Sequence, residues 1–109
     1  KLELMESEGL WDRLMDAVTT AGRLFILDRY EAALKKRYPN EMLEAYACIL
    51  TKEAAAVSDR KRYQELVRYL KKLRNYPGGA ERAAQLAEDW RARYTRRRAM
   101  MEELRDAGF

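Results

Sequence analysis

The sequence predicts an all-α fold of five or six antiparallel helices. Apolar residues recur every three or four positions through most of the chain, which is the period of an amphipathic helix. Strong helix formers dominate, and only 5 Gly and 2 Pro occur among 109 residues. We expect the helices to stack as hairpins in a tetratricopeptide-like α-α superhelix, with a closed helical bundle as the alternative.

Three helices are predicted in the first half of the chain. The first spans residues 7–20, with Ser7 as its N-cap. The second spans residues 23–37 and ends before Pro39, because the residue before a proline disfavours the helical conformation. The third begins at Asn40, its cap, or at Glu41 and runs to about residue 57. Its apolar face is the widest, so we expect neighbours on two sides of it.

Three more helices are predicted in the second half, over residues 60–75, 80–94 and 96–107. Ser58-Asp59 caps the first of them, and Pro77-Gly78-Gly79 forms the turn before the second. Gly108 fits a helix stop, after which Phe109 can fold back. The apolar faces predict a core that includes Tyr46, Leu50, Leu66, Leu70, Trp90 and Leu104.

A weak internal repeat favours the superhelix over the bundle. Arg29-Tyr30-Glu31-Ala32-Ala33-Leu34 resembles Arg62-Tyr63-Gln64-Glu65-Leu66-Val67, which lies 33 residues further along the chain. Tetratricopeptide-like hairpins repeat at about 34 residues. Each run is followed by a Tyr-Pro pair, but the spacing to that pair differs between the two runs. The closed bundle therefore stays the alternative fold.

Length and composition predict a single helical domain, residues 1–109. The chain starts abruptly and without Met, which indicates a fragment of a longer protein. The single cysteine excludes an intrachain disulfide and favours a cytoplasmic setting. The uncharged stretches are too short to span a bilayer, so no membrane partner is expected.

The residue inventory predicts no catalytic, cofactor-binding or metal-binding residue. The chain has no histidine and one cysteine. Catalysis by an imidazole group is therefore excluded, and the usual ligands of a zinc site are missing. Cys48 stands beside Ile49 on an apolar helix, where we expect a small buried hydrophobe. The sequence therefore predicts a protein that is not an enzyme and that binds no cofactor.

Charge is distributed unevenly, with a net charge of −2 over residues 1–57 and +6 over residues 58–109. Arginines interleave with aromatic residues in the second part, a pattern that can bind nucleic acid or an acidic partner. The alternative, which we favour, is that Trp90 and Tyr94 share the core face and the arginines are solvated. The candidate contacts are Arg91, Arg93, Arg96, Arg97 and Arg98.

Several motifs resemble the C-terminal helical region of bacterial SWIM zinc-finger proteins. They are Ser58-Asp59-Arg60-Lys61-Arg62-Tyr63, Leu70-Lys71-Lys72-Leu73, Pro77-Gly78-Gly79, Trp90-Arg91-Ala92-Arg93-Tyr94 and Arg97-Arg98-Ala99-Met100-Met101-Glu102-Glu103-Leu104. The resemblance implies that this chain is a C-terminal helical fragment of a larger, cytoplasmic bacterial protein. In that family a Cys-x-Cys and Cys-x-His zinc module lies upstream. None of its ligands occurs in this chain, so zinc and DNA binding are not carried over.

These observations predict a non-enzymatic helical scaffold that presents a surface to a protein. The partner is an upstream domain of the same protein or another protein. The alternative is an accessory nucleic-acid-binding surface beside an upstream zinc-finger module.

Overall fold

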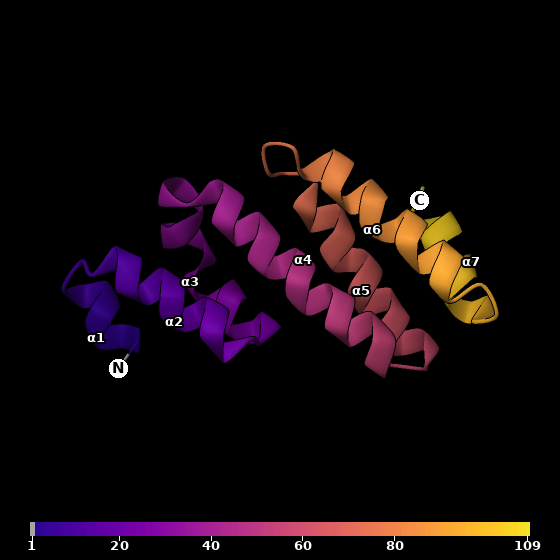
Figure 1. Cartoon of the computed structure of the whole chain (residues 1–109), viewed down its shortest axis with the longest axis horizontal. Coiled ribbons are helices and arrows are strands. Elements are labelled where there is room, and N and C mark those ends of the chain that lie inside the picture. Colours follow the sequence, from indigo (N-terminus) through magenta and orange to yellow (C-terminus); the bar gives the residue numbers. More distant parts are fainter. Residues whose placement is uncertain (1) are drawn as a thin grey trace. The chain divides into compact units, whose positions relative to one another are not determined.

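The computed structural model describes residues 2–109, and this range is all-α, with seven helices and no strand (Figure 1). The predicted fold class is confirmed. The helices are α1 (Leu2–Ser7), α2 (Trp11–Ala21), α3 (Leu24–Arg37), α4 (Pro39–Ala56), α5 (Arg60–Leu73), α6 (Gly79–Arg93) and α7 (Arg98–Asp106).

The helices group into two compact units, one ending at Ile49 and the other spanning Leu50–Phe109, so the division falls within α4. In the first unit, α2 packs against both α1 and α3. In the second unit, α5 packs against both α6 and α7 (Figure 1). A tetratricopeptide-like arrangement of the whole chain and its behaviour as one domain stay predictions.

A separate helix that was not predicted, α1, precedes the first predicted helix, which corresponds to α2. Ser7 is the last residue of α1, and its hydroxyl donates a hydrogen bond to the carbonyl of Leu4 at 3.2 Å. Gly9 then takes a φ of 71°, its N–H donates to the carbonyl of Glu6, and the N–H of Leu10 donates to the carbonyl of Met5. This pair of bonds is a Schellman motif, which ends a helix. The prediction that Ser7 caps a helix was therefore wrong.

The cap predicted at Asn40 was also wrong, because α4 already begins at Pro39. The carbonyl of Tyr38 accepts the first helical hydrogen bond of α4, from the N–H of Met42 at 2.9 Å. Proline is well suited to the first helical position, since the N–H that it lacks would have no partner within the helix there. Pro39 thus ends α3 and starts α4.

The two turn signals of the second half lie at helix boundaries, as predicted. Asp59 precedes α5 in an extended conformation, but its side chain makes no capping hydrogen bond. Pro77 and Gly78 form the turn between α5 and α6, and Gly79 is already the first residue of α6. A Cβ atom at Gly79 would lie 1.6 Å from the carbonyl oxygen of Leu73, so the turn requires glycine there.

All six residues predicted for the core are buried, each with at most 3% of its surface exposed. Positions that correspond in the internal repeat also match: Tyr30 and Tyr63 are buried, as are Leu34 and Val67. The helical period thus identified the inward faces of α3 and α5 correctly.

Candidate functional site

The five arginines of the predicted site lie in α6, α7 and the segment between them. Arg91 is exposed on α6, and its guanidinium donates a hydrogen bond to the backbone oxygen of Phe109. The Nε of Arg93 lies 2.9 Å from both carboxylate oxygens of Asp89, one helical turn away. This hydrogen bond raises the pKa of Arg93 above its ordinary value. Both side chains therefore already bind groups of their own chain.

Arg97 is half-buried and binds the end of α4. Its guanidinium donates to the carbonyls of Ala54 at 2.6 Å, Val57 at 3.3 Å and Ala55 at 3.4 Å. The last carbonyls of a helix have no partner within it, so a cation at this position satisfies them. The guanidinium also lies 4.1 Å from the centroid of the Tyr94 ring. Arg97 therefore links the segment before α7 to the last turn of α4.

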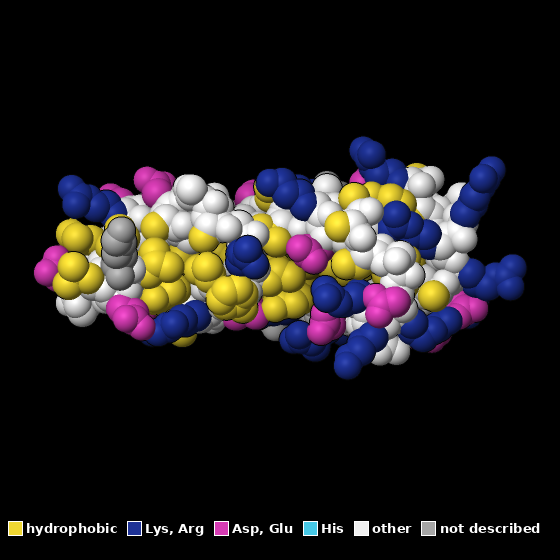
Figure 2. Space-filling model, turned by 90° about the horizontal axis from the view of Figure 1, so that it is seen from below, with side chains coloured by type: hydrophobic (Ala, Val, Ile, Leu, Met, Phe, Trp, Pro, Cys, Tyr) yellow, Lys and Arg dark blue, Asp and Glu magenta, His cyan; other side chains and the backbone are white. Residues whose placement is uncertain are grey.

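Arg96 and Arg98 are both exposed to solvent, and Arg98 is the first residue of α7. Figure 2 shows Lys and Arg side chains gathered over the second unit, in agreement with the charge of residues 58–109. Of the five predicted contacts, these two present a guanidinium to a partner most directly.

Trp90 and Tyr94 do not share the same environment. Trp90 is buried in the core, whereas Tyr94 is half-exposed and carries the Arg97 guanidinium against its ring. A base could not stack on Trp90 without displacing core side chains. Tyr94 is the aromatic residue of this segment that solvent reaches.

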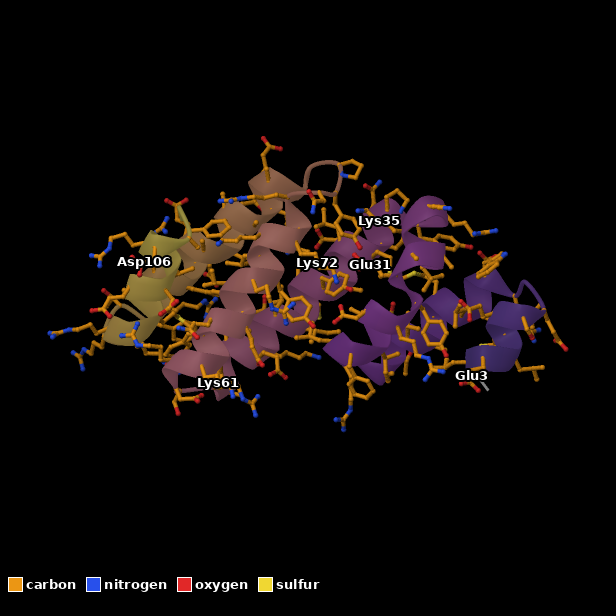
Figure 3. The ribbon with its side chains drawn as sticks, turned by 180° about the vertical axis from the view of Figure 1, so that it is seen from behind. Glu3, Glu31, Lys35, Lys61, Lys72 and Asp106 are labelled. Carbon is orange, nitrogen blue, oxygen red and sulfur yellow. The ribbon has the colours of Figure 1, made fainter. Side chains whose placement is uncertain are left out.

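A charged cluster joins α5 to α7. Arg60 donates hydrogen bonds to Glu102 at 2.5 Å and to Glu103 at 2.8 Å, and Gln64 donates to Glu103 at 3.3 Å. The hydrogen bond from Arg60 lowers the pKa of Glu102, and the same contacts raise the pKa of Arg60. A groove of about 310 Å³ follows this contact and reaches Asp106 of α7, labelled in Figure 3.

The first unit contains a larger groove between α2 and the first half of α4, with a volume of about 630 Å³. It is lined by apolar or small side chains and by three carboxylates. From α2 come Met15, Asp16, Thr19 and Thr20, and from α4 come Glu41, Glu44, Ala45 and Cys48. The hydroxyl of Thr19 donates to the carbonyl of Met15 at 2.9 Å, so this hydroxyl is already hydrogen-bonded within α2.

Sequence reasoning missed this groove because it placed Cys48 in the core. Cys48 is exposed and lies on the groove wall, so that prediction was wrong. The spacing contained the signal: Glu41, Glu44, Cys48 and Lys52 are three or four residues apart and form the exposed face of α4. The apolar neighbours of Cys48 in the sequence point to other faces of the helix.

Within residues 2–109, no group of three or more His, Cys, Asp and Glu side chains is arranged to hold a metal ion. No helix of this range is both long and apolar enough to cross a membrane. Comparisons with protein-family models, with curated proteins and with solved structures find no match.

Proposed function

We propose that this chain is a non-enzymatic helical scaffold that binds a segment of another protein or domain in the groove between α2 and α4. The observation that carries the proposal is the groove itself, with its volume of about 630 Å³ and its lining of two helices. A groove between two helices is a common binding site for a third helix, whose apolar face it covers.

The groove lining suits such a contact. Met15 and Ala45 are each only 6% exposed and form an apolar base, and Ala45, Cys48 and the two threonines are small. Small side chains allow a third helix to approach closely, because interaxial distance follows the size of the side chains at the contact. The charged residues of the lining provide groups that orient the bound segment.

A peptide selection tests this proposal. A library of helical peptides is displayed against the immobilised chain, and against the same chain alkylated at Cys48 with a bulky maleimide. Because Cys48 is the only cysteine and is exposed, alkylation occupies the groove without changing the core. We expect peptides that bind the unmodified chain and lose binding to the alkylated one. Equal enrichment on both forms would contradict the proposal.

The alternative is an accessory nucleic-acid-binding surface in the second unit. The exposed guanidiniums of Arg96 and Arg98 and the net charge of +6 over residues 58–109 favour it. A titration with duplex and single-stranded oligonucleotides at two salt concentrations tests it. Binding that weakens steeply with salt and is reduced by Arg96→Ala supports this alternative, since released counterions drive phosphate contacts. Absence of binding at low salt would contradict the nucleic-acid-binding alternative.

The resemblance to the helical region of SWIM zinc-finger proteins stays a prediction, and so does the place of this chain in a larger bacterial protein. Under that prediction, the upstream domain of the same protein is one source of the bound segment. The residues that precede Lys1 in the full protein provide the test. A Cys-x-Cys and Cys-x-His pattern there supports the resemblance.

A further inference from the structure

We infer that the groove between α2 and α4 selects a basic amphipathic helix, one with Lys or Arg flanking a small apolar face. This inference rests on the proposed function and names the chemistry of the partner. The described lining contains three carboxylates, Asp16, Glu41 and Glu44, and no Lys or Arg. The chain as a whole carries +4, so the local charge of the groove is opposite to that of the molecule.

The carboxylates stand on both walls of the groove. Glu41 and Glu44 are three residues apart on α4, and Asp16 comes from α2. All three side chains are exposed, while Met15 and Ala45, which line the same groove, are buried. A bound helix therefore meets an apolar base and carboxylates on either side. This arrangement is complementary to a helix with an apolar stripe between cationic side chains.

Charge also excludes other occupants. An acidic peptide or a nucleic acid brings negative charge against the three carboxylates, and like charges across an interface oppose binding. The electrostatics of the groove thus differ from those of the exposed arginines of the second unit, and the two surfaces suit different partners.

Cys48 provides a direct measurement at the groove wall. Three peptides of about 16 residues share one Leu/Ala face and carry Lys, Glu or Gln at every polar position. The rate at which Cys48 reacts with a neutral maleimide is measured with each peptide. At about ten times its Kd, the Lys peptide should slow the reaction about tenfold, because only the free fraction reacts. Raising the salt from about 0.05 M to about 0.5 M should weaken that protection.

Charge-reversal variants locate the contact. Asp16→Lys and Glu41→Lys should each raise the Kd of the Lys peptide about tenfold, measured by the fluorescence anisotropy of a labelled peptide. Glu88→Lys makes the same change in net charge on the exposed surface of α6 and should leave the Kd unchanged. Circular dichroism confirms that each variant is folded. If a charge-reversal variant does not fold, the milder substitution at the same position, Asp16→Asn or Glu41→Gln, is used in its place.

The outcomes separate this inference from the proposed function. If the Glu or Gln peptide protects Cys48 as well as the Lys peptide, the groove is an interaction surface but the inferred partner class is wrong. If no peptide protects Cys48 at low salt, the proposed function and the inferred partner class are both wrong. If raising the protein concentration alone protects Cys48 and increases the sedimentation coefficient, the occupant is a second copy of this chain, and the inference is overturned.

Discussion

At the scale of single residues, Leu70 tests whether the inward face of α5 is assigned correctly. Its side chain is fully buried in the core of the second unit. Leu70→Ala removes apolar contacts and leaves a cavity, so it should lower the free energy of unfolding by about 2–5 kcal/mol. Urea denaturation followed by circular dichroism measures this loss. Phe25→Ala is the control, because Phe25 is 65% exposed and its truncation should change stability by less than about 0.5 kcal/mol.

Arg97 and Arg96 are adjacent arginines that should respond very differently to truncation. Arg97 binds three backbone carbonyls at the end of α4, whereas Arg96 is exposed. Arg97→Ala should destabilise the chain by about 1–3 kcal/mol, because hydrogen bonds from a charged donor are lost and carbonyls are left without a partner. Arg96→Ala should change stability by less than about 0.5 kcal/mol. Equal effects in thermal or urea denaturation would show that Arg97 does not hold this contact.

At the scale of elements, the turn between α5 and α6 depends on Gly79 more than on Gly78. A Cβ atom at Gly79 would meet the carbonyl of Leu73 at 1.6 Å, whereas a Cβ atom at Gly78 has nothing within 4 Å. Gly78 has a φ of 71°, so alanine there is strained by about 1 kcal/mol. Gly79→Ala should cost about 2–3 kcal/mol, because it forces the backbone of the turn apart. A larger loss for Gly78→Ala in urea denaturation would contradict this reading.

The charged contact between α5 and α7 predicts a dependence on pH. Arg60 lowers the pKa of Glu102 in the folded chain below its ordinary value of 4.5. The stabilisation is therefore complete above the ordinary pKa and is lost as the pH falls through the lowered, folded value. Between pH about 6 and about 3, the thermal midpoint should fall more for the natural chain than for Glu102→Gln. Glu88→Gln, a control outside the cluster, should behave like the natural chain.

At the scale of the whole molecule, the stability of the chain should not depend on a metal ion. Within residues 2–109 the acidic residues and Cys48 form no group that could hold one, and buried apolar side chains occur in both units. We expect the thermal midpoint to be the same with and without EDTA. A midpoint that falls by several degrees with EDTA and recovers with zinc or calcium would show that a metal site exists.

The helical period and the turn residues of the sequence were enough to predict the fold class, the inward faces and several helix ends. Leu66, Leu70 and Leu104 were predicted to be buried and are buried, because a helical period fixes which side chains share a face before any tertiary contact forms. The turn at Pro77-Gly78 was predicted for a similar reason, since proline and glycine act on their own backbone. Gly9, with its φ of 71°, is an equally local signal of a helix end, and it contradicts the predicted cap at Ser7.

Which groups of distant segments meet depends on packing and could not be predicted from the sequence. Nothing near Arg97 in the sequence indicates that its guanidinium reaches carbonyls more than 40 residues away. The groove of the first unit likewise needs α2 and α4 at a definite separation, which depends on packing rather than on periodicity. Helical period tells which residues of α4 face outward together, including Glu41, Glu44 and Cys48. Only packing brings Asp16 into the same groove, because α2 and α4 are separated by α3 in the sequence.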